Sequence, residues 1–145
     1  MGQGSIIGYE INEKTCQISY YNDQQLEPDT LEVDADNYQI PLIIGKLRDT
    51  WAYGKEAKRL VTIKEGFTVT RLLSKSLAGD RIEFGEETYD AVWLLSQFIQ
   101  MSLQSFPEIE GIVFTVPALT EELAQMLRGI AVRMNINKRH VFIQD

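Results

Sequence analysis

Two continuous, predominantly apolar runs near the end of the chain flank one amphipathic segment, and this pattern restricts the fold more than any other feature. The runs are residues 111–116 and 141–143. Between them, residues 120–134 place apolar side chains three and four positions apart, which is the spacing of a helix with one buried side. A run without polar alternation is typical of a strand covered on both faces. Strand, helix and strand in this order predict two parallel strands joined by a helical crossover.

The N-terminal part of the chain follows a different period. Apolar and polar side chains alternate over residues 14–21, which is typical of a strand with one buried face. Residues 5–11 are apolar and β-branched, and a short polar link separates the two segments, so together they predict a hairpin. Residues 40–44 predict a third strand of the same antiparallel meander, with Pro41 near its start or on an edge because proline cannot donate to a ladder.

The region between these strands and the crossover contains helical and short extended segments. Apolar residues at helical spacing predict a long helix over residues 86–106, which Pro107 ends. Shorter elements are expected before it: a strand at 51–53, helices at 55–61 and 68–77, and a strand at 81–84. Residues 22–37 are polar and acidic, which predicts a solvated loop. A calcium-binding loop is excluded there because no glycine stands at the turn position.

These elements together predict one α/β domain over residues 1–145. Its fold class is a mixed five-stranded sheet, in which an antiparallel three-strand meander and two parallel strands meet at the strand 5–11, with helices on both faces. The chain has 145 residues, of which 44% are hydrophobic and 24% charged, so it is long and apolar enough to bury such a core.

Charge and cysteine content exclude several classes of function. The 14 basic and 21 acidic residues give a net charge of −7, so phosphate backbones and anionic lipids would repel the chain unless its few cations cluster. Lys55, Lys58 and Arg59 are too few to bind nucleic acid. No apolar run approaches the ~20 residues that span a bilayer. The single cysteine, Cys16, excludes an intramolecular disulfide, so we expect a cytoplasmic protein that binds neither nucleic acid nor membrane.

Three segments form a further pattern. The first is the glycine-containing strand at 6–12, and the second runs from the proline-containing strand at 40–44 to an Ala-Lys pair at 57–58. The third is Ile-Val-Phe-Thr-Val-Pro-Ala at 112–118, followed by a helix. In this order they resemble the N-terminal lobe of the actin and seventy-kilodalton heat-shock chaperone ATPase superfamily. The resemblance covers most of the chain and implies a ribonuclease H-like fold.

The resemblance implies a nucleotide site at the first hairpin. The family has a hydrophobic-Gly-x-Asp-x-Gly-Thr-Thr hairpin there, which cradles phosphates and helps to hold a metal through water. The nucleotide- or phosphate-binding residues implied for this chain are Gly8, Asn12, Lys14 and Thr15. Glu10 and Asp145 would flank the cleft as catalytic carboxylates, with Glu10 on the metal side through water. The implied cofactors are ATP and Mg²⁺, bound by a longer protein.

The hairpin departs from the family pattern. Glu10 stands in place of Asp, and Asn12-Glu13-Lys14 in place of Gly-Thr-Thr, so a side chain and a negative charge enter where the backbone should approach phosphate. The chain stops at Asp145, before the second phosphate loop and the C-terminal lobe of the family. We therefore expect an N-terminal lobe whose partner is a missing C-terminal lobe, without ATPase activity of its own.

Two other functions stay open. The first is a catalytically degenerate scaffold or protein-interaction module of the same fold. The second, ranked last, is a metal-dependent nuclease of the ribonuclease H-like class, which needs several converging carboxylates, whereas only Glu10 can be placed. A protein partner or a second copy in a homodimer would bind an apolar helix face, because Trp93, Leu94 and Met101 lie outside the main apolar stripe of residues 86–106.

Four further residues are expected to be structural. His140 is the only histidine and has no second metal ligand near it in sequence, so we expect a solvated loop histidine. Cys16 alternates with apolar residues and should face the core. Trp51 and Trp93 should pack against other side chains rather than stack on a ligand.

Overall fold

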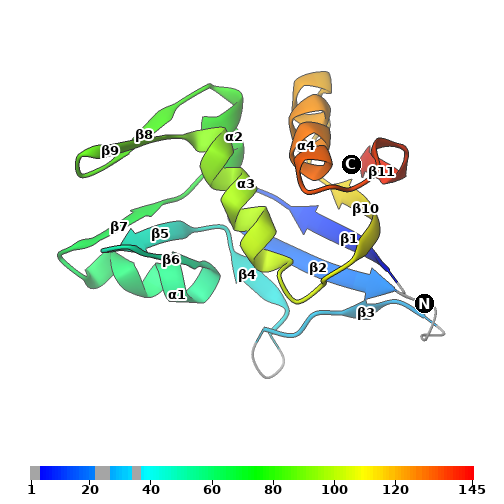
Figure 1. Cartoon of the computed structure of the whole chain (residues 1–145), viewed down its shortest axis with the longest axis horizontal. Coiled ribbons are helices and arrows are strands. Elements are labelled where there is room, and N and C mark those ends of the chain that lie inside the picture. The colour runs from blue at the N-terminus through cyan, green and yellow to red at the C-terminus, as the bar shows by residue number, and fades with distance from the viewer. Residues whose placement is uncertain (1–3, 22–26, 34–36) are drawn as a thin grey trace. The chain divides into compact units, whose positions relative to one another are not determined.

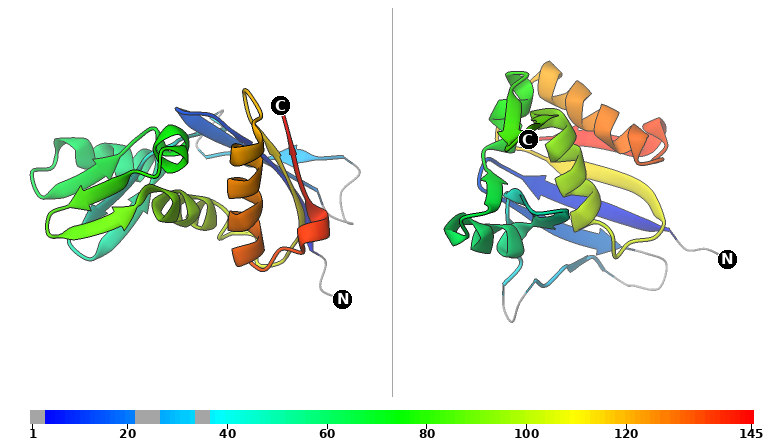
Figure 2. Two further views of the ribbon diagram at one scale, coloured as in Figure 1. Left: turned by 90° about the horizontal axis from the view of Figure 1, so that it is seen from above. Right: turned by 60° about the vertical axis from the view of Figure 1, so that its left-hand side comes forward.

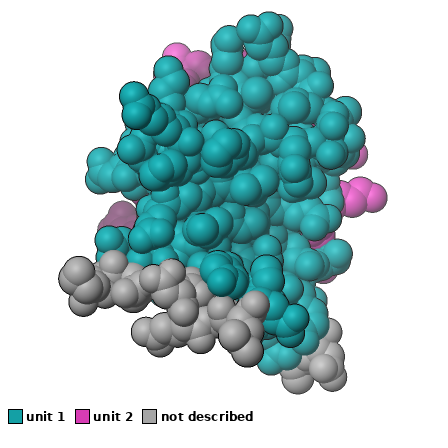
Figure 3. All heavy atoms as spheres, turned by 90° about the vertical axis from the view of Figure 1, so that its right-hand side faces the viewer, with its two compact units in different colours: residues 1–12, 16–39, 104–145 teal, residues 13–15, 40–103 magenta. Residues whose placement is uncertain are grey.

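The computed structural model describes residues 4–21, 27–33 and 37–145 (Figure 1). The chain forms two compact units, which Figure 3 colours separately. Unit 1 consists of Met1–Asn12, Cys16–Gln39 and Gln104–Asp145, and unit 2 of Glu13–Thr15 and Ile40–Leu103. Helices and strands occur in both units, so the chain is a mixed α/β protein, as the sequence predicted.

Unit 1 is built on a six-stranded mixed sheet, one strand more than predicted. Its order is β11-β10-β1-β2-β3, and the sixth strand, β4 (Gln39–Pro41), pairs with β2 outside this order. The other strands are β1 (Ser5–Ile11), β2 (Thr15–Tyr21), β3 (Asp29–Thr30), β10 (Ile109–Thr115) and β11 (Val141–Gln144). β1 pairs antiparallel with β2 and parallel with β10, and β10 pairs parallel with β11. The prediction that the antiparallel strands join the parallel ones through the first strand is therefore confirmed.

The predicted crossover helix is α4 (Glu121–Arg133), which lies along one face of this sheet and packs against β11 (Figure 2). Thr120 caps it, because its hydroxyl oxygen accepts a hydrogen bond from the Leu123 N–H at 3.2 Å. Two acidic residues in the first turn complement the positive end of the helix dipole. A short 3₁₀ turn, η2 (Lys138–His140), then leads into β11.

Alternate residues of the central strands form the core of unit 1. The fully buried side chains there include Ile7, Tyr9, Ile11, Ile18, Ile112 and Phe114. The rings of Tyr9 and Phe114 meet edge to face, with centroids 5.6 Å apart. Cys16 is buried beside them, with its sulfur 3.5 Å from the Tyr9 hydroxyl, and burial raises the pKa of its thiol to about 12. The predicted core position of Cys16 is confirmed.

Unit 2 consists of short elements that follow one another closely in sequence. A three-stranded sheet has the order β6-β5-β7, with β5 (Ile44–Leu47), β6 (Thr50–Tyr53) and β7 (Gly66–Val69). Between and after these strands come α1 (Gly54–Arg59), η1 (Leu60–Thr62) and α2 (Leu72–Leu77), then the hairpin of β8 (Arg81–Phe84) and β9 (Glu87–Asp90), and α3 (Ala91–Ser102). Within the described residues, no helix is both long and apolar enough to span a membrane.

The predicted helix over 86–106 is too long at both ends. Gly85 has a φ of +67°, which favours glycine and turns the chain so that β9 pairs antiparallel with β8. The helix therefore begins at Ala91, and it ends at Ser102 rather than at Pro107. Similarly, the predicted helix over 68–77 starts late, because Val69 pairs with β5 and Arg71 adopts a left-handed φ of 57°.

The predicted third strand at 40–44 is confirmed only in its first residues, because β4 (Gln39–Pro41) pairs with β2. The chain bends there, since the Ile43 N–H donates to the Pro41 carbonyl, and the residues divide between β4 (Gln39–Pro41) and β5. The strand that continues the order β1-β2 is β3, which pairs with β2 inside the segment predicted as an acidic loop. Part of that predicted loop, 22–26 and 34–36, lies outside the described residues.

Candidate functional site

The parallel strands of unit 1 end in a row of polar side chains. Glu10 on β1 is level with Thr115 on β10, and Thr115 is level with Gln144 on β11. On its other side, Glu10 is opposite Gln17 of β2. Neighbouring strands lie about 4.8 Å apart, so these four residues, the carboxyl-end row, cross about 14 Å of sheet.

The carboxyl-end row lies where the connections from two adjacent strands, β1 and β10, run to opposite sides of the sheet. β1 turns back into β2 on one side, whereas β10 leads through α4 to β11 on the other. Ligands of open α/β sheets bind outside the carboxyl ends of the strands at such a switch point. Glu10, which is exposed, and Thr115 stand on either side of it.

Hydrogen bonds hold the β11 end of the row. The Gln144 Nε2 donates to Thr115 Oγ1 at 3.2 Å, and the Val116 N–H donates to the Gln144 carbonyl at 2.9 Å. The carboxylate of Asp145 accepts a hydrogen bond from the Leu119 N–H at 3.1 Å. Asp145, which the sequence analysis placed beside the cleft, therefore binds the loop that precedes α4.

Gly8 lies two residues before Glu10 on β1, directly opposite Ser19 of β2. A Cβ at Gly8 would collide with the Ser19 hydroxyl oxygen, so the missing side chain makes room for that hydroxyl. Gly8, Glu10 and Asn12 share one side of the hairpin strand by alternation, while Ile7, Tyr9 and Ile11 are buried on the other.

The turn after β1 belongs to unit 2, and the carboxylate of Glu13 in this turn forms hydrogen bonds within that unit. Glu13 Oε1 accepts hydrogen bonds from the Ser74 N–H at 2.7 Å and from the Ser74 hydroxyl at 2.6 Å. It thereby caps α2, since the preceding Arg71 offers no side-chain cap. The Lys14 carbonyl accepts from the Leu42 N–H at 2.8 Å in the same unit. Lys14 and Thr15 are thus placed in unit 2, whereas Gly8, Glu10, Asn12 and Asp145 belong to unit 1.

The donor set of the carboxyl-end row is one carboxylate, one hydroxyl and two amides. Mg²⁺ is bound by one or two carboxylates and keeps several of its waters, so these groups fit a water-mediated contact with that ion. Among the described residues, no three carboxylate, imidazole or thiolate groups converge as metal ligands. The described part of the chain therefore lacks the carboxylate cluster that a two-metal nuclease needs.

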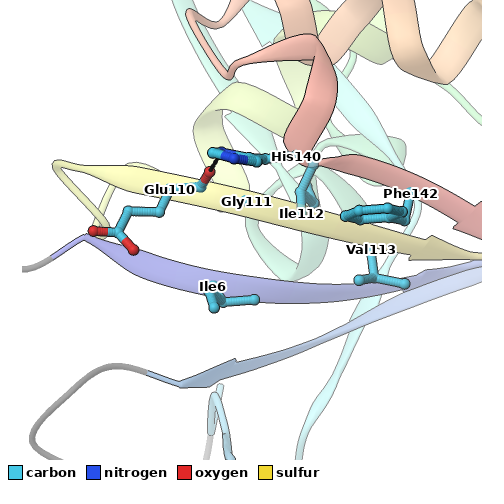
Figure 4. A pocket seen from close by; sticks show the side chains of 7 residues that line it. All are labelled: Ile6, Glu110, Gly111, Ile112, Val113, His140 and Phe142. Atoms are coloured by element: carbon cyan, nitrogen blue, oxygen red, sulfur yellow. Dashed lines mark hydrogen bonds between the residues drawn. The ribbon is translucent and has the colours of Figure 1, made fainter.

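The same face of the sheet carries an apolar hollow of about 270 Å³, which Figure 4 shows from close by. Its lining residues are Ile6, Glu110, Gly111, Ile112, Val113, His140 and Phe142. Ile6 is 46% exposed and Phe142 57%, so this side of the sheet presents an apolar surface to solvent. The His140 ring is exposed but held, because its Nδ1 lies 3.0 Å from the Glu110 carbonyl oxygen.

Unit 2 has a separate cluster of aromatic rings around one lysine. Tyr89 and Trp93 stack at 5.3 Å, and Trp51 meets both edge to face at 5.2 and 5.6 Å. The Lys46 ammonium lies 5.1 Å from the centre of the Trp51 ring and 2.8 Å from a Glu87 oxygen. The hydrogen bond to Glu87 raises the pKa of Lys46 to about 12, and Lys46 lowers the pKa of Glu87. Both tryptophans pack against other rings as predicted, although Trp93 remains 41% exposed.

Residues 27–145 match the model of a family described as "Family of unknown function (DUF5716) C-terminal". The chain belongs to this family. The match contains Thr115, Gln144 and Asp145 but begins after the β1–β2 hairpin, so Glu10 and Gln17 lie outside it. No curated protein matches the chain in sequence.

Three members of the carboxyl-end row, Gln17, Thr115 and Gln144, were missed by sequence reasoning. Thr115 is the polar residue near the end of the first apolar run and Gln144 directly follows the second, which is the one signal that could have found them. Gln17 has no such signal, because only the register of the hairpin places it opposite Glu10.

Proposed function

We propose that the chain is a nucleotide-binding lobe of the actin-like and chaperone-like type, with a ribonuclease H-like sheet. The observation that carries this proposal is the pair Glu10 and Thr115 at the carboxyl ends of adjacent parallel strands, at the switch point of the sheet. The order of the three resembling segments along the chain supports it. A cytoplasmic location is part of the same proposal.

In this proposal each residue of the carboxyl-end row contacts either the metal ion, its water molecules or the phosphates. Mg²⁺ bound to ATP would neutralise part of the phosphate charge, and Glu10 would hold it through a water molecule. The Thr115 hydroxyl and the Gln17 and Gln144 amides supply neutral hydrogen-bond donors for phosphate oxygens or metal waters. The Glu13 carboxylate, whose sequence position suggested a negative charge near the phosphates, accepts two hydrogen bonds from Ser74 within unit 2.

The chain alone should bind Mg-ATP weakly and turn it over at no measurable rate. One carboxylate and three neutral groups provide few contacts, and no further carboxylate of the row is available as a base. We therefore expect a dissociation constant of roughly millimolar, which corresponds to about −4 kcal/mol.

An NMR titration of the ¹⁵N-labelled chain with Mg-ATP tests this proposal. The amides of Glu10, Thr115 and Gln144 should shift together, and Glu10→Gln should remove the dependence of these shifts on Mg²⁺. Glu83→Gln, the same change at an exposed position of β8, is the matched control and should leave the titration unchanged. Saturable shifts elsewhere, or no shifts at 10 mM nucleotide (about ten times the dissociation constant expected above), would contradict the proposal.

The second candidate function is an interaction module without nucleotide chemistry. The exposed Trp93 on α3 favours it, because a partly exposed tryptophan within an aromatic cluster is typical of interface anchors. Trp93→Glu should then leave a folded monomer that no longer binds its partner or a second copy. Unfolding of this variant, measured by circular dichroism, would instead assign Trp93 to the core of unit 2.

A further inference from the structure

The open face of unit 1 is the side of its sheet that exposes Ile6 and Phe142. Among the residues that the structure describes, no helix of that unit covers the parallel strands on this side. Parallel strands are normally covered on both faces, and here α4 covers only one. The uncovered side has Ile6, Val113 and Phe142 at its centre, beside the hollow shown in Figure 4. An apolar surface of this kind fits a partner helix that also exposes apolar surface.

The charged side chains around the open face indicate which charge a partner surface should carry. Glu110 lines the hollow, and Glu10 stands four residues along β1 from Ile6, which is about 13 Å. No lysine or arginine is among the residues that line the hollow. Two open faces brought together by a two-fold axis would contribute Glu10 and Glu110 from each copy, with no lysine or arginine from the hollow lining to pair with them. The charge pattern therefore favours a basic partner surface over a symmetric pair.

A surface of that kind exists on the outer side of α4. Gln125, Arg128, Gly129 and Val132 follow each other at helical spacing and, with Lys138, line a hollow of about 480 Å³. Val132 is 43% exposed, and a Cβ at Gly129 would meet nothing within 4 Å. We call this the α4 stripe.

The α4 stripe is basic in an otherwise acidic chain. Residues 123–144 contain four lysines and arginines and no carboxylate, although the net charge of the whole chain is −7. None of the ion pairs formed among the described residues uses Arg128 or Lys138. Both cations are therefore available to a carboxylate from another molecule.

We propose that the open face of one copy binds the α4 stripe of a second copy. The Phe142 ring, 57% exposed on one copy, enters the space above Gly129 of the other, and Glu110 faces the Arg128 and Lys138 cations. The two surfaces are different, so the contact is head-to-tail, and a pair of copies keeps one free open face and one free α4 stripe to which further copies can bind. This proposal concerns unit 1 alone and does not depend on nucleotide binding.

Sedimentation velocity over a concentration series tests the contact. The wild-type chain should form species larger than a dimer as its concentration rises, and salt should weaken them because the contact includes exposed charges. Arg128→Glu should damage only the α4 stripe and Phe142→Asp only the open face. Each variant alone should sediment as a monomer, with an apparent dissociation constant raised at least about tenfold.

The decisive sample is an equimolar mixture of the two variants. Arg128→Glu keeps an intact open face and Phe142→Asp keeps an intact α4 stripe, so the mixture should form a one-to-one dimer that grows no further. Lys64→Glu and Ile63→Asp make the same kinds of change at exposed positions of unit 2 and should assemble like the wild type. Matching thermal melts of all variants exclude unfolding as the cause.

Three results would overturn the proposal. The wild-type chain could remain monomeric at the highest concentration reached. Arg128→Glu alone could still dimerise while Phe142→Asp does not, which would indicate a symmetric contact through the open face. Lastly, the mixture could remain monomeric although both variants are folded, which would show that the two surfaces do not bind each other.

Discussion

The two units bury their apolar side chains over very different sequence distances. In unit 1, β1 (Ser5–Ile11) pairs with β10 (Ile109–Thr115), so its core depends on residues about a hundred positions apart in the chain. In unit 2, β8 pairs with β9 and β5 with β6, each across a short turn. Local pairing costs little loop-closure entropy, whereas the sheet of unit 1 forms only when its two ends meet.

The side chains of the two units differ as well. The core of unit 1 is made of aliphatic residues around the Tyr9 and Phe114 rings, whereas unit 2 places aromatic rings near its surface around Lys46. The chain also contains a separate spectroscopic or chemical reporter in each unit. Both tryptophans of the chain, Trp51 and Trp93, lie in unit 2, and the single cysteine, Cys16, lies in unit 1. Tryptophan fluorescence and thiol labelling can therefore follow the two units independently.

The largest expected effect is the loss of the buried ring in unit 1. Phe114→Ala should cost about 3–5 kcal/mol, because Phe114 is fully buried and its ring packs on Tyr9. Phe142→Ala on the neighbouring strand should cost less than about 0.5 kcal/mol, since that ring is exposed. Urea denaturation followed by Cys16 labelling measures both. If Phe114→Ala shifts the tryptophan transition as much as the labelling transition, the units unfold as one and the comparison fails.

A smaller effect is expected in unit 2 from the cap that Glu13 provides. Glu13→Ala leaves the Ser74 N–H without its acceptor and should cost about 1 kcal/mol, the usual value of a helix cap. The loss should appear first in the tryptophan transition. Glu65→Ala removes a carboxylate from an exposed pair with Arg48 and should change stability by less than about 0.5 kcal/mol. Equal effects of the two variants would argue against the capping role.

The smallest effect is a pH dependence in the aromatic cluster. Lys46 lowers the pKa of Glu87, so the ionised carboxylate stabilises the fold above its ordinary pKa and this stabilisation is lost as the pH falls through the lowered value. The melting temperature of Glu87→Gln should therefore be below that of the wild type at pH 7. The difference should shrink below about pH 5 and vanish in stronger acid. A difference that stays constant with pH would show that the pair contributes by packing rather than by charge.

Sequence reasoning was most successful where one period continued over many residues. The strand at 5–11, the buried run at 111–116 and the helix capped by Thr120 are all present, because long apolar patterns leave few alternative structures. It failed over 86–90, where the helical spacing of apolar residues continued through a hairpin strand. Gly85 and the pairing of β9 with β8 overrode the periodicity there.

The residues of the candidate site also differ in whether the sequence alone could identify them. Glu10 could be selected from the sequence alone, because it lies near the end of an apolar strand at the place where the resembling family has a carboxylate. Its neighbours Thr115 and Gln144 could not, since they are brought level with Glu10 only by the register of β1 with β10 and of β10 with β11. A shift of one residue in either pairing would turn these side chains to the other face of the sheet.

The sequence by itself determined the mixed α/β class, the parallel crossover and the burial of Cys16, because hydrophobic period and chain order are local properties. Tertiary structure alone decided that Glu13 turns to Ser74, that Phe142 is exposed while Phe114 is buried, and that Arg128 and Lys138 border one hollow. Each of these depends on contacts between residues distant in the chain. Such contacts are chosen by packing and register, which no local pattern of side chains encodes.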